Sequence, residues 1–371
     1  MAPTEILAEQ HMLSLTSILA QHGISVGMLK GSMRSKNKSE TLLNLASGKL
    51  DVVVGTHAII QDGVEFSKLG LVIVDEQHRF GVKQRLALHK KGNSPHVLVM
   101  TATPIPRTLT MTYYGDLDTS VIKDMPPGRK PIKTHWKPNS EALSVYQSAQ
   151  KLIEQGRQIF VVCPLIEESE KLDIKAAVKT ADYFQTVIYP GFKVELLHGQ
   201  QPPEVKSDIM ERFARREIDV LVSTTVIEVG IDVPNATIMI IQDADRFGLS
   251  QLHQLRGRVG RGNHPSFCIL LSDGKTLESR KRLNVMTETN DGFRIAEEDL
   301  MLRGPGEYLG VRQSGIPDLH FGDLIKDFEL LDLARQEAVD LVAADPLLSN
   351  PSNALLLKSI KETHKSSELL R

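Results

Sequence analysis

Short continuous runs of valine, isoleucine and leucine alternate with helical patterns along most of this chain, and this alternation limits the fold more than any other feature. Such runs are typical of strands that lie in a parallel sheet with both faces buried. The predicted strands are residues 51–56, 71–75 and 97–101 in the first third, followed by residues 158–163, 193–197, 218–224, 237–242 and 267–271. The chain is therefore predicted to be α/β, with parallel sheets.

Three regions are expected within the 371 residues, because domains usually contain about 100–200 residues. The segment Pro126-Pro-Gly-Arg-Lys-Pro131 interrupts regular structure and is predicted to link a first domain, residues 1–130, to a second, residues 131–274. Residues 275–371 are mostly helical and charged in pattern, with an interruption at Arg303-Gly-Pro-Gly306.

Composition excludes several classes of protein. The 44 lysines and arginines nearly balance the 46 aspartates and glutamates, so any DNA contact would depend on local basic surfaces. Cys163 and Cys268 lie outside any metal-binding spacing and are expected to be core thiols of a reducing compartment. The first residues lack a signal-peptide pattern, and no apolar stretch reaches the roughly 18 residues that span a bilayer. A soluble, cytoplasmic chain is expected.

Asp75 and Glu76 directly end the apolar run 69–74, where a parallel strand delivers side chains to the usual ligand edge of the sheet. In phosphoryl transfer from ATP, Asp75 would suit a magnesium role and Glu76 the activation of water. Thr101 and Thr103 follow the next predicted strand and could relay phosphate occupancy. Taken alone, the acidic pair is a weak signal, and a simple strand-ending turn is favoured for the threonines.

The second half of the chain carries complementary groups. Gly230 and Asp232 lie at another predicted strand-to-helix edge. Arg258 and Arg261 are three residues apart and would share one face of a helix, where they could neutralise a transferring phosphoryl group as arginine fingers do. Glycines at positions 257, 260 and 262 argue against an ordinary surface helix, since each lowers helix stability.

No G-x-x-x-x-G-K-[ST] phosphate loop precedes the acidic pair. Gly274-Lys-Thr276 matches the last three residues of this phosphate-loop pattern, but Ile269 occupies the position of its first glycine. This segment is therefore predicted to be a turn and a helix start.

Eight segments, in this order, resemble the motifs of the superfamily-two helicases, and specifically those of the RecG family of branched-DNA translocases. They are residues 1–11, 55–58, 75–81, 101–107, 160–170, 197–199, 223–234 and 251–262. Each motif is modestly specific, but eight in the correct order are very specific. The resemblance covers nearly the whole chain and implies two RecA-like domains, a helical translocation region and a helical tail.

Residues 291–315, taken together with Arg282, resemble the translocation motif that RecG shares with the transcription-repair coupling factor. In that motif a helical hairpin and loop couple ATP-driven closure to movement on duplex DNA. The resemblance implies ATP and Mg²⁺ as cofactors and assigns roles to individual residues. The implied catalytic residues are Asp75 (also for Mg²⁺, through the nucleotide), Glu76, Gln254, Arg258 and Arg261; the nucleotide-coupling residues are His78, Thr101, Thr103, Gly230 and Asp232; the DNA-contacting residues are Pro3, Thr4, Gly55, Thr56, His57 and Thr224; and the translocation residues are Arg282, Arg303 and Gln313.

The chain differs from the family pattern at its amino-terminal side. Family members carry a wedge domain and a phosphate loop there, and the sequence has no counterpart of either. A truncated form with an incomplete first RecA-like domain is therefore expected, and this chain alone is not expected to hydrolyse ATP. The complete protein would remodel stalled forks and Holliday junctions in recombination and repair. It would act as a monomer in the bacterial cytoplasm, at the nucleoid, with branched double-stranded DNA as partner and single-stranded DNA-binding protein as a further candidate. A fragment of the coupling factor and a non-enzymatic DNA-binding fragment are the alternatives.

Overall fold

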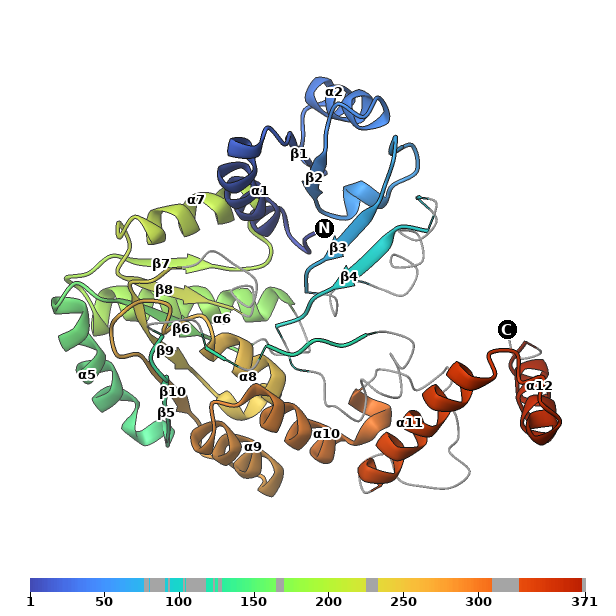
Figure 1. Ribbon diagram of the computed structural model, residues 1–371. Coiled ribbons are helices and arrows are strands. Elements are labelled where there is room, and N and C mark those ends of the chain that lie inside the picture. The colour runs from blue at the N-terminus through green and yellow to red at the C-terminus, as the bar shows by residue number, and fades with distance from the viewer. Residues whose placement is uncertain are drawn as a thin grey trace. The chain divides into compact units, whose positions relative to one another are not determined.

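The computed structural model of the chain (Figure 1) describes residues 1–76, 80, 91–92, 94–102, 104, 118–122, 124–125, 129–164, 170–224, 233–308 and 327–368. Contacts between residues divide the chain into two compact units. The first unit comprises Met1–Pro104 and Asp124–Asp299, and the second comprises Ile105–Lys123 and Leu300–Arg371. The first unit contains two separate groups of strands. We call residues 1–104 the first α/β region and residues 124–299 the second α/β region.

The first α/β region contains two pairs of parallel strands, β1 with β2 and β3 with β4. The elements are α1 (Glu5–Leu19), η1 (Ala20–His22), β1 (Val26–Leu29), α2 (Ser35–Ala46), β2 (Val52–Gly55), η2 (His57–Ile60), β3 (Leu71–Val74) and β4 (His96–Val99). Met1 and Ala2 connect the pairs: the Ala2 N–H donates to the Gly55 carbonyl at 2.8 Å, and the Met1 amino group donates to the Ile73 carbonyl at 2.7 Å.

Helix α1 begins where the sequence provides a cap. The Thr4 hydroxyl accepts a hydrogen bond from the Leu7 N–H at 3.4 Å, and Glu5 places negative charge in the first turn. Ala8 is fully buried and belongs to the same apolar cluster as Ala2 and Val54. The helix therefore covers one face of the sheet beside β2.

The second α/β region is built on a six-stranded, wholly parallel sheet in the order β5-β10-β9-β6-β8-β7. Its strands are β5 (Lys133–Lys137), β6 (Gln158–Val162), β7 (Val194–Leu197), β8 (Val220–Ser223), β9 (Ala236–Ile241) and β10 (Phe267–Leu271). Its helices are η4 (Asn139–Glu141), α5 (Ala142–Glu154), α6 (Glu170–Tyr183), η5 (Phe184–Ile188), α7 (Pro203–Ala214), η7 (Ala244–Arg246), α8 (Leu249–Arg256), α9 (Leu277–Glu288) and the start of α10 (Gly292–Tyr308). Every residue of β6, β8 and β9 is buried, because helices cover both faces of the sheet (Figure 1).

The α/β class and the parallel sheets are confirmed, and each predicted strand is present with ends shifted by at most two residues. Two strands were missed. Strand β5 contains lysine, threonine and histidine, and β1 contains Gly27, so neither forms a continuous apolar run. Domain boundaries at residues 130 and 274 stay predictions.

The expectation of burial on both faces is wrong for β3 and β4. Leu71 and Ile73 are 56% and 41% exposed, and Leu98 is 49% exposed. Val72 and Val74 on the opposite face are buried in a cluster with Phe80. Only one face of this strand pair is therefore covered, so the apolar run alone did not determine its environment.

From Leu300 onward the described residues of the second compact unit are mostly helical, as predicted for the tail. It contains the end of α10, followed by α11 (Phe328–Ala344), η8 (Pro351–Asn353) and α12 (Ala354–Glu368). Helix α10 is kinked at Gly304, where φ is +74°, so the predicted interruption at this glycine is confirmed. Throughout the described part of the chain, the helices lack the combination of length and apolar composition that a membrane crossing requires.

Candidate functional site

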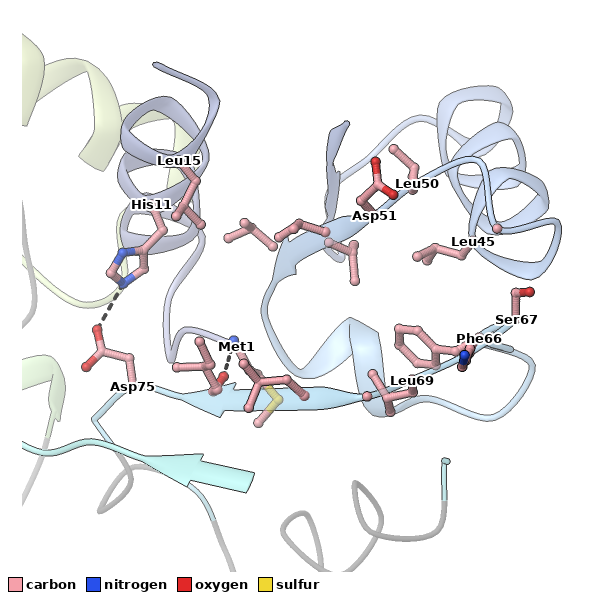
Figure 2. Close-up of a pocket in the computed structure, with 18 of the residues that line it drawn as sticks. Met1, His11, Leu15, Leu45, Leu50, Asp51, Phe66, Ser67, Leu69 and Asp75 are labelled. Carbon is pink, nitrogen blue, oxygen red and sulfur yellow. Dashed lines mark hydrogen bonds and ion pairs between the residues drawn. The ribbon is translucent and has the colours of Figure 1, made fainter. Parts of the chain in front are cut away.

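The acidic pair lies at the carboxyl end of β3, in contact with helix α1. Asp75 Oδ2 is 2.9 Å from His11 Nε2, and Asp75 Oδ1 accepts the Glu76 N–H at 2.9 Å (Figure 2). The hydrogen bond from His11 lowers the pKa of Asp75 below its ordinary value, against the opposing effect of burial. The Asp75 carboxylate is therefore held in its ionised form and in a defined orientation.

Glu76 adopts a backbone conformation that non-glycine residues rarely use, with φ at +51°. Such strain is characteristic of residues whose position is constrained by their surroundings. Its Oε2 lies 3.5 Å from the Ala102 N–H, at the longest distance of a hydrogen bond. The contact joins the ends of β3 and β4, so the segments that carry Glu76 and Thr101 lie side by side. His78 and Thr103 lie outside the described residues.

Carboxylate oxygens such as those of Asp75 suit Mg²⁺, but the described residues contain no group of three or more histidine, cysteine or acidic side chains that could hold a metal ion. A magnesium ion at Asp75 would therefore take further oxygens from a bound phosphate. The sequence contains no G-x-x-x-x-G-K-[ST] loop to hold such a phosphate. The residues present thus fit only part of a magnesium–nucleotide site.

The predicted DNA-contacting residues of the first region gather where Ala2 meets the end of β2. Thr4 caps α1, whereas Gly55 ends β2 and His57 begins η2. Thr56 is buried, and His57 is exposed. A side chain at Gly55 would place its Cβ 1.9 Å from the Leu29 carbonyl oxygen, so packing against β1 is sufficient to require this glycine. Pro3 stands beside Thr4 in the same short link.

In the second region, Gln254 belongs to α8, whereas Arg258 and Arg261 lie beyond its end. The helix ends at Arg256, so the two arginines do not share a helical face. Gly260 has φ at +76°, and a Cβ on Gly262 would lie 2.4 Å from the Pro234 carbonyl oxygen. The glycines therefore argued correctly against an ordinary surface helix.

Arg256 is a residue that sequence reasoning missed. It is 2% exposed, and its guanidinium donates to the carbonyls of Met286 at 3.0 Å and Thr289 at 2.8 Å. It also lies 3.1 Å from His253 Nδ1. Burial, with Arg256 nearby, lowers the pKa of His253 to about 4. Arg256 thus anchors the segment preceding Arg258 to the end of α9. The sequence has three arginines within these six residues, and nothing in it indicates which of them is buried.

Thr224 is buried directly after β8, and its N–H donates to the Leu197 carbonyl at 3.2 Å. Gly230 and Asp232 lie outside the described residues. Thr276 caps α9 by accepting the Ser279 N–H at 3.1 Å, which confirms the predicted helix start. Both cysteines are buried, and burial raises the pKa of each thiol to about 12, in keeping with core thiols.

The predicted translocation residues lie in different settings. On α9, the Arg282 guanidinium donates to the Asp245 carbonyl at 2.9 Å, so it makes a tertiary contact with η7. Arg303 is exposed and directly precedes the kink at Gly304. Gln313 lies outside the described residues.

Three family models match the chain. Residues 1–112 match the DEAD/DEAH box helicase model, residues 144–263 match the helicase conserved C-terminal domain, and residues 289–368 match the C-terminal part of domain 3 of the ATP-dependent DNA helicase RecG. Together the matches follow the order in which the motifs were found.

Individual proteins give the same assignment. The ATP-dependent DNA helicase RecG of Bacillus subtilis is 51% identical over 356 residues, which cover 96% of this chain and 52% of that protein. That of Streptococcus pneumoniae is 52% identical over 91% of this chain and 50% of its own length. A solved structure of RecG bound to a three-way DNA junction has a TM-score of 0.70 and 44% identity, covering 90% of this chain and 43% of that one.

More distant structures share the fold alone. Saccharomyces cerevisiae Dbp5 bound to RNA and ADP BeF3 has a TM-score of 0.56 at 14% identity, covering 91% of this chain and 80% of that one. This chain spans about half the length of the curated relatives it matches. Over that span, its motifs, its parallel sheets and these comparisons agree, and the chain belongs to the RecG family of ATP-dependent DNA helicases.

Proposed function

We propose that this chain carries the residues that activate water and couple hydrolysis to movement in an ATP-dependent, RecG-type helicase acting on branched DNA. The observation that carries the proposal is the acidic pair at the end of β3, with Asp75 oriented by His11 and Glu76 lying against Ala102. An ATP-bound Mg²⁺ would supply charge neutralisation at the phosphates. Asp75 would hold that ion, and Glu76 would orient and deprotonate the attacking water.

Groups of the second α/β region would complete the reaction. Arg258 and Arg261 suit the stabilisation of negative charge, because a guanidinium stays protonated and donates several hydrogen bonds. Gln254 lies one turn before them on α8. Arg256 would act as a positioning residue, since its hydrogen bonds to Met286 and Thr289 fix the segment from which Arg258 projects. Gly230 and Asp232 keep the coupling role implied by the resemblance.

DNA contact is assigned to the link between Ala2 and α1 and to the end of β2. Pro3 and Thr4 stand in that link, and Gly55, Thr56 and His57 lie where β2 ends and η2 begins. In the second region, Thr224 directly follows β8. Branched DNA is the proposed substrate because the related structure is described as RecG bound to a three-way DNA junction. Action as a monomer, and contact with single-stranded DNA-binding protein, are further parts of the proposal.

The 371 residues alone should not hydrolyse ATP, because they contain no phosphate loop to hold the β- and γ-phosphates. The test compares ATP hydrolysis by this chain and by its Glu76→Gln variant, with and without a three-way DNA junction. Equal background rates are expected. A junction-stimulated rate well above that of the variant would mean that the chain binds nucleotide in an unrecognised manner.

A second arm tests the assigned roles. The phosphate-loop segment of the Bacillus subtilis relative is joined to the amino-terminal side of this chain, and ATP hydrolysis is measured with the junction present. Activity that Glu76→Gln abolishes is expected. Junction binding without hydrolysis in this restored chain would instead support a non-enzymatic DNA-binding protein and would contradict the proposal.

A further inference from the structure

A short loop, Lys30-Gly31-Ser32, follows β1 and precedes α2 in the first α/β region. We call it the 30–32 loop. Leu29 at the end of β1 pairs with Gly55 at the end of β2, so the loop lies at the carboxyl edge of these parallel strands. This edge is the usual place for ligands in α/β folds. The loop is therefore close to Gly55, to which DNA contact is assigned.

The 30–32 loop directs hydrogen-bond donors at the side chain of Glu5, the first residue of α1. The Ser32 N–H donates to Glu5 Oε1 at 3.0 Å, and the Ser32 hydroxyl donates to Glu5 Oε2 at 2.6 Å. Lys30 Nζ lies 4.0 Å from Glu5 Oε2. One carboxylate is thus surrounded by a backbone N–H, a hydroxyl and an ammonium group from the same short loop.

These donors favour a negative charge at this point. Burial by itself would raise the pKa of Glu5. The hydrogen bonds from Ser32, with smaller effects of Lys30 and the Gly31 backbone, lower that pKa below its ordinary value. The Lys30 side chain is only 23% exposed, and its ammonium group also donates to Glu9 Oε1 at 2.5 Å. The surroundings of the Glu5 carboxylate therefore stabilise an anion.

The amino end of α1 adds to this effect. The helix contains 15 residues and begins at Glu5, after the Thr4 cap, and the amino end of a helix carries partial positive charge that attracts anions. Residues 26–39 contain no acidic residue and four basic ones, Lys30, Arg34, Lys36 and Lys38. Because the whole chain has a net charge of −2, this basic character is local.

Phosphate oxygens accept the same kinds of hydrogen bond as carboxylate oxygens. Lysine ammonium groups, serine hydroxyls, backbone N–H groups and the amino ends of helices are the groups that contact phosphates in protein–DNA complexes. The Glu5 side chain is 25% exposed, so it can turn outward to water while α1 keeps its Thr4 cap. The Glu5 carboxylate thus occupies a position that suits a phosphate group.

We infer that the 30–32 loop and the amino end of α1 form a phosphate-binding site, and that the Glu5 carboxylate is an internal competitor which the phosphate must displace. Such a phosphate has two sources, the DNA backbone and free phosphate, and the position beside Gly55 favours the backbone. Only this choice of source rests on the proposed function, because the site is built from residues of this chain. Competition with Glu5 would keep the contact weak, as a protein that releases and rebinds DNA while it moves requires.

The test follows the amide signals of Gly31 and Ser32 in the full chain by NMR while inorganic phosphate is added. In Glu5→Ala the competitor is absent, so the dissociation constant for phosphate should fall about tenfold. Glu5→Gln, whose neutral amide still accepts from Ser32 and holds the loop, should show a smaller gain. The matched control is Glu40→Ala on α2, which removes the same charge from an exposed position and should bind phosphate as the parent chain does. Adding Lys30→Gln to Glu5→Ala should remove most of the gain.

A second arm replaces inorganic phosphate with a three-way DNA junction at several salt concentrations. If the DNA backbone is the source, Glu5→Ala should bind the junction more tightly, with a salt dependence steeper by about one unit. A gain for inorganic phosphate without one for the junction would support the site and assign it to free phosphate. An unchanged phosphate affinity in both Glu5 variants, or an equal gain in Glu40→Ala, would overturn the inference. A chain that binds no junction would contradict the proposed function instead, and the phosphate arm would still decide this inference.

Discussion

His11 Nε2 lies 2.9 Å from Asp75 Oδ2, which connects the middle of helix α1 to the end of β3 across a sequence separation of 64 residues. His11 stands two turns after the Thr4 cap, on the face that also carries Ala8. The same cap that starts the helix therefore determines that this imidazole reaches the acidic pair.

Replacing His11 with alanine should raise the pKa of Asp75 toward its ordinary value, since the lost hydrogen bond is the main cause of the shift. The stabilisation from a lowered carboxyl pKa is complete above the ordinary value of 3.8 and disappears as pH falls through the folded-state pKa. His11→Ala should therefore unfold at a higher pH on acid titration, with a loss below about 1 kcal/mol at neutral pH because the pair is partly exposed. Circular dichroism is the measurement; His22→Ala, in the exposed η1, should match the parent chain.

A histidine in the second region should make stability depend on pH. Burial lowers the pKa of His253 to about 4, from 6.5, so the unfolded chain binds more protons between these values. The free energy of unfolding should therefore fall as pH decreases from 6.5 to 4, by up to about 1.4 kcal/mol per pH unit from this group. His253→Asn should flatten this dependence, whereas the exposed His264→Asn should not. Urea unfolding can be followed by the fluorescence of Trp136 in β5, and parallel profiles for all three chains would contradict the assignment.

Arg256→Lys should destabilise the second α/β region by about 2–4 kcal/mol, because lysine cannot serve the buried carbonyls of Met286 and Thr289 together. Arg261→Lys is the matched control. Arg261 is exposed, and its substitution should change stability by less than about 0.5 kcal/mol. The measurement is the urea midpoint of unfolding of each variant, compared with that of the parent chain. A larger loss of stability in Arg261→Lys than in Arg256→Lys would show that Arg256 is not the anchoring arginine.

Gly55 has two competing explanations, a DNA contact and a packing requirement. Gly55→Ala brings a Cβ into the Leu29 carbonyl oxygen and should destabilise the first region by about 1–3 kcal/mol. Gly70→Ala, where nothing lies within 4 Å of the added Cβ, should be nearly neutral. Thermal unfolding without DNA separates the explanations, since a stable Gly55→Ala chain that fails only in DNA binding would favour the contact.

Arg303 offers a test of coupling against DNA contact in a complete family member that carries this segment. Its exposed position before the kink at Gly304 suits a segment whose direction changes with domain closure. Arg303→Ala should keep most DNA-stimulated ATP hydrolysis and lose fork unwinding. A parallel fall in hydrolysis and DNA affinity, with the salt dependence of binding reduced by about one unit, would identify a phosphate contact instead.

Much of the fold follows from local sequence. In β6, β8 and β9 every position except Gln158 is apolar or small, so burial on both faces is the arrangement that removes these side chains from water. Cap residues also act locally: Thr276 starts a helix at the predicted position, and Thr4 caps the start of α1. The acidic pair and the motif order were likewise readable, because strand ends in parallel sheets bring chemistry to one edge.

Other properties depended on contacts between distant segments, which no local pattern encodes. The apolar run of β3 resembles that of β6, yet one of its faces is exposed, because covering elements are a property of the assembled sheet. Arg256 and Arg258 are two residues apart and similar in sequence context, but only the carbonyls at the end of α9 decide that Arg256 is internal. The hydrogen bond between His11 and Asp75 likewise joins residues far apart in the sequence, so it forms only once Met1 and Ala2 have bonded to β3 and β2 and brought α1 beside the end of β3.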